Sequence, residues 1–310
     1  VQPGKNVELP ITPEEQEGLT IGGPRNILDL LVQIIPENPI AALAEMNMLN
    51  VIFFSVLFGI ALTRVRPRLR ESFMGFSESV YEAMVVMTGW IIKLVPIGVF
   101  GLIIKAINNT EPSFFKSVLF YILTVAAGLL IHLLIIQPLI LYLFTKRNPY
   151  VHFRRMSSAI VTVLATASSL ATMPVTMKCV EENAKVPKRI TDFVIPLGAT
   201  INMDGTALYE CVAAMFIAQA YGLDLSLGTQ FIIVLVALLT SIGVAGIPAA
   251  SLVAITVILG VIGLPLEGIG MLLVTDRILD MLRTAVNVFS DSCAAVVIAR
   301  SEGEKQVLAS

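Results

Sequence analysis

The sequence predicts an all-α integral membrane protein built from broken helices that repeat with opposite orientation. Of its 310 residues, 56% are hydrophobic and only 14% are charged, and the mean hydropathy of +0.84 exceeds that of ordinary soluble domains. Long uncharged stretches are interrupted by glycine, proline and small polar residues, which is typical of membrane helices broken inside a protein. One apolar segment near the C-terminus, residues 270–299, nevertheless carries several ionisable side chains.

The composition also argues against several classes of function. A net charge of −2 without a basic patch gives no sign of a nucleic-acid partner. No nucleophile–histidine–carboxylate motif of an enzyme is present. Cys179, Cys211 and Cys293 match no disulfide or zinc pattern. His132 and His152 lack metal-ligand spacing, so we expect them to have packing or interface roles.

The first part of the chain is expected to enter and cross the membrane in pieces. Residues 1–25 hold four prolines and four glutamates and are predicted to form an extracellular loop. Residues 26–63 alternate apolar runs with proline, which predicts a broken membrane helix. Four arginines between positions 64 and 70 follow and place this end on the cytoplasmic side. A span at 83–106 is interrupted by lysine and proline.

Residues 117–144 form the next predicted span. The loop before it, about 107–116, is then external and contains the glycosylation sequon Asn108-Asn109-Thr110, which matters only in a eukaryotic secretory pathway. Basic residues between positions 146 and 155 return the chain to the cytoplasm.

A first re-entrant hairpin is predicted at about residues 155–178. Residues 156–177 are uncharged and long enough to cross, but basic residues flank them on both sides, so both ends belong on the cytoplasmic side. Its tip is expected at 166–174, where small polar residues and a proline suit exposed backbone at membrane depth.

A broken span and a second hairpin follow. The span, about 190–222, contains GATINMDGT at 198–206. Its asparagine, aspartate and glycines are poor helix formers and predict an unwound middle, in which Asp204 needs polar partners. Residues 228–266 carry no charge, and their centre at 240–251 is rich in glycine and small residues. Each arm is about 20 Å long as a helix against about 30 Å of hydrocarbon, which predicts a second re-entrant hairpin, entering from outside.

The last helix, about 270–300, carries the densest polar pattern. Its five polar positions are spaced four, three, four and four residues apart and therefore share one helix face. They are Asp276, Asp280, Arg283, Asn287 and Asp291. Because each ionised group near a bilayer centre costs roughly 2.5–3.5 kcal/mol, this face should line a protein cavity. The alternative is a structural ion pair of Asp280 and Arg283. Residues 301–310 form the predicted cytoplasmic tail.

The order of hairpin, broken span, hairpin and polar span is repeated with inverted orientation. Inverted repeats with broken helices and a site near the membrane midplane are typical of secondary transporters. The alternative for the tips alone is that they are flexible loops between ordinary spans.

Three motifs add a resemblance. NMDGTALYE at 202–210, SIGVAGIP at 241–248 and LDMLRTAVNVFSD at 279–291 are similar to those of the dicarboxylate/amino-acid:cation symporter family, which includes animal excitatory amino-acid transporters and archaeal aspartate transporters. The resemblance implies a glutamate-transporter-type elevator fold and a homotrimer in the lipid of the plasma membrane. Residues 26–112 would form the trimeric scaffold and 113–300 the moving transport domain. It also implies that the first three transmembrane helices of the family are missing from the front of this sequence.

The resemblance further implies an acidic amino acid, L-glutamate or L-aspartate, as substrate. Arg283, assisted by Thr206, would hold the side-chain carboxylate, and Asp280 would hold the α-amino group. Asn287 and the first hairpin's two serines would hold the main-chain carboxylate, and backbone at 247–251 would close over the ligand. The implied substrate-binding residues are Ser168, Ser169, Thr206, Ile247, Ser251, Asp280, Arg283, Thr284 and Asn287.

Co-transported sodium is implied at three sites, where carboxylate and carbonyl oxygens suit a hard cation. The first uses Gly198, Asn202, Asn287 and Asp291. The second uses Thr200 with carbonyls near Ser241, Ile242 and Val244. The third uses Asp204 and Asn202 and is completed by the missing third helix.

Glu210 stands where the animal members of the family have a glutamate that is implicated in proton co-transport and potassium counter-transport. We therefore expect proton coupling at Glu210. The alternative is a hydrogen-bonded structural carboxyl group.

Departures from the family pattern bear on selectivity. Leu170 stands where the family usually has a third serine. Val244 stands where some members have a threonine, and Ser251 stands where glycine is common. The family's other substrate-side arginines are absent at Ala167 and Met281, which leaves Arg277 as a candidate substitute. A neutral amino-acid exchanger and a C4-dicarboxylate symporter are alternatives, against which Arg283 and Asp280 argue respectively. An anion channel is the alternative from a different class.

Overall fold

The computed structural model describes residues 2–4, 35–44, 48–93, 97, 112–243, 250–264 and 266–308. All regular structure in these ranges is helical, as predicted. The chain divides into two compact units, Arg25–Glu111 and a second unit of Val1–Pro24 with Pro112–Ser310. The predicted sequon and the tip of the second hairpin at 244–249, with Val244 and Ile247, lie outside the described residues.

The unit Arg25–Glu111 contains α3 (Pro39–Ala44), α4 (Met48–Leu62) and α5 (Pro67–Ile92). The Asn38 side chain caps α3 by accepting a hydrogen bond from the Ile40 amide at 2.9 Å. α5 begins earlier than the predicted span, because proline is well tolerated in the first helical turn. Most side chains of α4 and α5 are exposed, including Phe76 at 66%.

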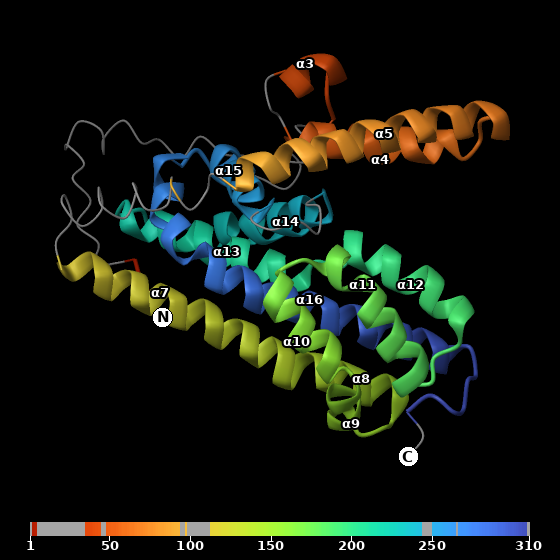
Figure 1. The fold of residues 1–310 in the computed structure, drawn as a ribbon. Coiled ribbons are helices and arrows are strands. Elements are labelled where there is room, and N and C mark those ends of the chain that lie inside the picture. The colour runs from red at the N-terminus through yellow and green to blue at the C-terminus, as the bar shows by residue number, and fades with distance from the viewer. Residues whose placement is uncertain are drawn as a thin grey trace. The chain divides into compact units, whose positions relative to one another are not determined.

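In the second unit, one long rod comes first (Figure 1). It consists of α7 (Pro112–Ile131), a π-helical turn η1 (His132–Ile136) and α8 (Gln137–Thr145). Lys116–Thr145 and Thr275–Ser301 are the two helices, among the described residues, that are long and apolar enough to cross a membrane.

The first predicted hairpin is a pair of short helices that pack together. After α9 (Pro149–Arg155), α10 (Ser157–Thr166) and α11 (Ser169–Lys178) are joined by two residues, and η2 (Cys179–Asn183) follows. Ala167 adopts a left-handed conformation, φ 50°, and the Ser168 hydroxyl accepts a hydrogen bond from the Ala171 amide at 3.2 Å. This cap starts α11 immediately, so the break is narrower than predicted and Pro174 lies inside the helix.

The predicted break within residues 190–222 is present but shorter than the predicted 198–206: α12 (Lys188–Ile201) and α13 (Asp204–Ala220) are separated by Asn202 and Met203 alone. α14 (Leu227–Gly243) and α15 (Ala250–Ile262) pack against each other and against α13.

A short 3-10 helix, η3 (Leu266–Met271), leads to α16 (Leu273–Ser301), the helix at the centre of this unit (Figure 1). It packs against α7, α8, α10, α12 and α13. The five polar side chains of its predicted face are all buried, with exposed fractions between 1% and 5%. The shared polar face is therefore confirmed.

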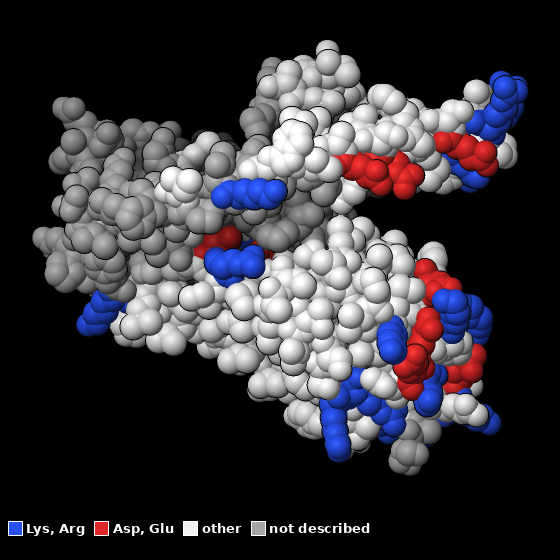
Figure 2. All heavy atoms as spheres, in the orientation of Figure 1, with Lys and Arg blue, Asp and Glu red and all other residues white. Residues whose placement is uncertain are grey.

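Charged side chains gather at the end of this unit that carries α9, the first residues of α12 and the tail (Figure 2). There the tail folds back rather than extending into solvent. Arg189 pairs with Glu302 at 2.7 Å, and the Leu308 amide donates to the Ala184 carbonyl at 3.1 Å. Val307 and Leu308 are buried in the apolar cluster that includes Cys179. The tail therefore covers the base of the first hairpin.

Val307→Asp should uncover that base. The change loses about 1.5–3 kcal/mol of apolar burial and places a carboxylate in an apolar cluster. We expect Cys179 to react several-fold faster with a maleimide, measured by peptide mass spectrometry on the purified protein. Gln306→Asp, at the exposed neighbouring position, is the control. Equal rates in both variants would show that the tail does not protect the hairpin base.

Candidate functional site

Arg283 and Asp280 form a buried ion pair on α16. Arg283 Nη2 and Nε donate to Asp280 Oδ1 at 2.7 and 3.0 Å, and the two side chains are 4% and 3% exposed. The spacing of three residues places them on adjacent turns. Thr284 Oγ1 donates to the Asp280 carbonyl at 2.6 Å. The ion pair considered from the sequence is thus formed.

A second carboxylate and an aromatic ring complete the surroundings of Arg283. Asp276 Oδ1 lies 3.9 Å from Arg283 Nη1 and accepts a hydrogen bond from the Tyr209 hydroxyl at 3.0 Å. The guanidinium carbon lies 4.8 Å from the centre of the Tyr209 ring, a cation–π contact. Arg283 Nη1 has no hydrogen-bond partner among the described residues. Arg277, by contrast, is exposed, so it does not share this buried position.

Asn287 joins α16 to the beginning of α13. Its Oδ1 accepts hydrogen bonds from the amides of Gly205 at 2.8 Å and Thr206 at 3.3 Å, which caps that helix. Its Nδ2 donates to Thr206 Oγ1 at 2.9 Å and to Met203 Sδ at 3.2 Å. Thr206 and Asn287, predicted as substrate ligands, are therefore brought together about one helical turn from Arg283.

One turn further, Asp291 meets the break between α12 and α13. Asn202 Nδ2 donates to Asp291 Oδ1 at 2.9 Å and to Ser290 Oγ at 3.0 Å. A Cβ atom on Gly198 would lie 2.5 Å from Asp291 Oδ1, so glycine is required for this approach. Gly198, Asn202 and Asp291 of the predicted first sodium site are thus adjacent, and the sequence reasoning had missed Ser290.

Asp204 has two partners from the long rod. His132 Nε2 lies 2.6 Å from Asp204 Oδ2, and Gln137 Nε2 donates to the same oxygen at 2.8 Å. His132 therefore lies at a helix interface, one of the two roles expected for it, and the sequence had not indicated Asp204 as its partner. The sequence prediction did not include Gln137, although His132 and Gln137 are both polar residues within an uncharged apolar span.

The predicted coupling residue, Glu210, is fully buried on α13. Its Oε2 accepts a hydrogen bond from Thr240 Oγ1 of α14 at 3.1 Å. Its Oε1 has no hydrogen-bond partner among the described residues. The contact links the broken span to the second helix pair.

The other predicted residues lie on the two helix pairs or on α12. Ser168 and Ser169 are buried at the break between α10 and α11. Ser251 is fully buried in α15. Thr200 is exposed and donates to the Leu197 carbonyl at 2.8 Å. Ser241, which is buried, and Ile242, which is 43% exposed, lie at the end of α14, which packs against α12.

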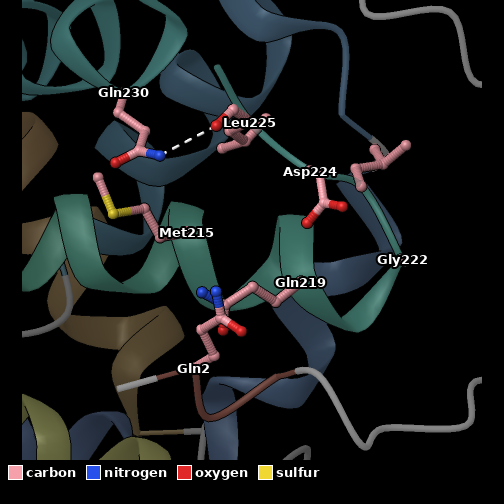
Figure 3. A pocket seen from close by; sticks show the side chains of 8 residues that line it. Gln2, Met215, Gln219, Gly222, Asp224, Leu225 and Gln230 are labelled. Carbon is pink, nitrogen blue, oxygen red and sulfur yellow. Dashed lines mark hydrogen bonds between the residues drawn. The ribbon is translucent and has the colours of Figure 1, made fainter. Parts of the chain in front are cut away.

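A separate cavity of about 420 Å³ lies at the far end of α13 (Figure 3). Gln219, Asp224 and Gln230 line it, and the Gln230 amide donates to the Leu225 carbonyl at 3.0 Å. None of the predicted site residues lines this cavity.

Residues 1–301 match the sequence profile of the sodium:dicarboxylate symporter family. The chain belongs to this family. It is therefore a member of a family of sodium-coupled membrane symporters and not an enzyme.

Several proteins similar to this chain are named excitatory amino acid transporters. The chain is 38% identical to excitatory amino acid transporter 1 of Bos taurus over 95% of its own length and 55% of that protein. It is 42% identical to the protein of the same name from Rattus norvegicus, over 81% of the chain and 47% of the relative. For excitatory amino acid transporter 3 of Mus musculus the identity is 40%, over 81% and 48%. The chain thus spans about half the length of these relatives.

The close approach of α13 to α16 predicts a sensitive glycine. A Cβ atom on Gly205 would lie 2.6 Å from the Arg283 carbonyl and 2.9 Å from Val286 Cβ. We expect Gly205→Ala to lower the melting temperature of the purified protein, at a cost of about 1–3 kcal/mol. Gly260→Ala is the control, because nothing lies within 4 Å of its Cβ position. Equal melting temperatures for both variants would contradict the close contact.

Proposed function

We propose that this chain carries the transport site of a sodium-coupled symporter for L-aspartate and L-glutamate that works by an elevator mechanism. The observation that carries the proposal is the buried Arg283 between Asp280 and Asp276. Two carboxylates and one guanidinium give this cluster a formal charge of −1. A ligand with both a carboxylate and an ammonium group can pair with Arg283 through the carboxylate and with Asp280 through the ammonium group.

An acidic amino acid meets that requirement. Its side-chain carboxylate would pair with the planar fork of Arg283, and its ammonium group with Asp280, so neither charge is left unpaired. Thr206 and Asn287 lie beside the cluster to receive the remaining polar groups. The buried serines Ser168 and Ser169 support a role of the first hairpin at the main-chain carboxylate.

Sodium coupling is supported by the buried carboxylate of Asp291. Among the described residues it has no basic partner within ion-pair distance, and it is 1% exposed. Gly198 and Asn202 lie against Asp291, and Asn287 lies one helical turn away. Carboxylate, amide and backbone carbonyl oxygens are the ligand type of a hard cation. We assign the second sodium site to Thr200 with Ser241, Ile242 and Val244, and the third to Asp204 and Asn202.

The lengths of the helix pairs support re-entrant hairpins. α10 and α11 have ten residues each, about 15 Å, and α14 and α15 reach about 25 and 20 Å, against about 30 Å of hydrocarbon. The second hairpin, with Ile247 and Ser251, would form the external gate.

The division into two units supports an elevator. The unit Arg25–Glu111, with its exposed apolar side chains, would form the homotrimeric scaffold in the lipid of the plasma membrane. The other unit would be the transport domain.

Arg283→Ala should abolish sodium-dependent binding of L-aspartate and L-glutamate to the purified full-length protein, measured by isothermal titration calorimetry. Losing one partner of a buried charge pair costs about 2–5 kcal/mol of binding free energy. Arg277→Ala, on the same helix but exposed, should bind as the wild type does.

Two results would overturn this assignment. Binding of L-serine or L-alanine that is indifferent to Arg283→Ala would indicate a neutral amino-acid carrier. Conductance without saturable, sodium-dependent accumulation would indicate a channel.

We further propose that Glu210 carries a co-transported proton and takes part in potassium counter-transport. Its support is full burial beside Thr240, with one carboxylate oxygen unpartnered among the described residues. Uptake by the wild type should then fall as external pH rises. Glu210→Gln should remove that dependence in proteoliposome uptake, while Glu304→Gln, at the charged end of the unit, should keep it. If uptake by Glu210→Gln has the same pH dependence as uptake by the wild type, the proposal of proton coupling at Glu210 is refuted.

A further inference from the structure

The π-helical turn η1 brings two polar side chains of the long rod to one acidic group. In an α-helix, residues five apart point about 140° away from each other. Here the Gln137 amide donates to the His132 carbonyl, so residue 137 stands directly above residue 132. Both side chains therefore reach Asp204 Oδ2.

Gln137 is buried, and only one of its two terminal amide atoms has hydrogen-bond partners among the described residues. Its exposed fraction is 3%. Nε2 donates to Asp204 Oδ2 at 2.8 Å and to the Val286 carbonyl at 3.3 Å. Oε1, in contrast, has no hydrogen-bond partner among the described residues. A buried amide oxygen without a partner is costly and points to a ligand.

We propose that Gln137 is a sodium ligand that joins Asp204, in the cation site assigned under the proposed function on which this inference rests. An N–H donor beside the carboxylate satisfies its charge without a cation but cannot coordinate one. A half-turn of the terminal amide exchanges Nε2 and Oε1, and such torsions are broad and roughly two-fold. Oε1 then faces Asp204 Oδ2 and the Val286 carbonyl.

The turned amide is stable only when a cation is present. Three oxygens facing one point repel each other when the site is empty, whereas they form a suitable set for a hard cation. In the observed orientation the amide nitrogen neutralises two of them instead. The two orientations therefore belong to the cation-free and cation-bound states, and sodium shifts the balance between them.

The test is a sodium titration of L-aspartate binding to the purified full-length protein, with the sodium-induced change in melting temperature without aspartate as a second readout. Gln137→Leu removes the oxygen and the donor together. Because loss of one group at a metal site typically costs 10–100-fold in affinity, we expect the half-saturating sodium concentration to rise about tenfold or more, with binding restored at high sodium. Gln219→Leu, at the far end of α13, should leave it unchanged.

The opposite result is equally informative. If Gln137 acts only as a hydrogen-bond donor that competes with sodium, Gln137→Leu will leave the half-saturating concentration unchanged or lower it, which overturns the proposal. Gln137→Met, an unbranched side chain without oxygen, gives the same measurement if the leucine variant does not fold. Absence of sodium-dependent binding in the wild type would instead refute the proposed function.

Discussion

Charge buried inside the protein is the constraint on which the rest of this structure depends. α16 places Asp276, Asp280, Arg283 and Asp291 where water does not reach them, and each needs a partner from the protein. The neighbouring elements are arranged accordingly. α13 supplies Tyr209 to Asp276, the helix break supplies Asn202 to Asp291, and Asn287 in return caps α13. These hydrogen bonds between buried polar groups, in addition to apolar packing, fix the register between α13 and α16.

Much of this arrangement could be predicted from single residues. The four-and-three spacing along 276–291 predicted a buried polar face, because spacing alone decides which residues share a side of a helix. Asn202, Asp204 and Gly205 predicted a helix break, because asparagine, aspartate and glycine are poor helix formers. The short apolar arms of 228–266 predicted two helices in place of one span, and the structure has α14 with 17 residues, longer than predicted, and α15 with 13.

Other features depend on contacts that are distant in sequence. The partner of His132 could not be predicted, because nothing in an apolar run shows that Asp204, 72 residues later, lies against it. A single π-helical turn has no sequence signal of its own, so the shared direction of His132 and Gln137 could not be foreseen. The burial of Val307 likewise follows from the shape of the hairpin base rather than from the polar composition of the tail.

The covered base of the first hairpin has a mechanical consequence. The tail continues from the last turn of α16. Its Glu302 pairs with Arg189 of α12, and the amide of Leu308 donates a hydrogen bond to the Ala184 carbonyl. These contacts connect the C-terminal end of α16 to α12 and to the segment between η2 and α12. Sliding or rotation of α16 alone at that end would break these contacts, so the tail couples the position of α16 to that of α12 and of the segment after η2.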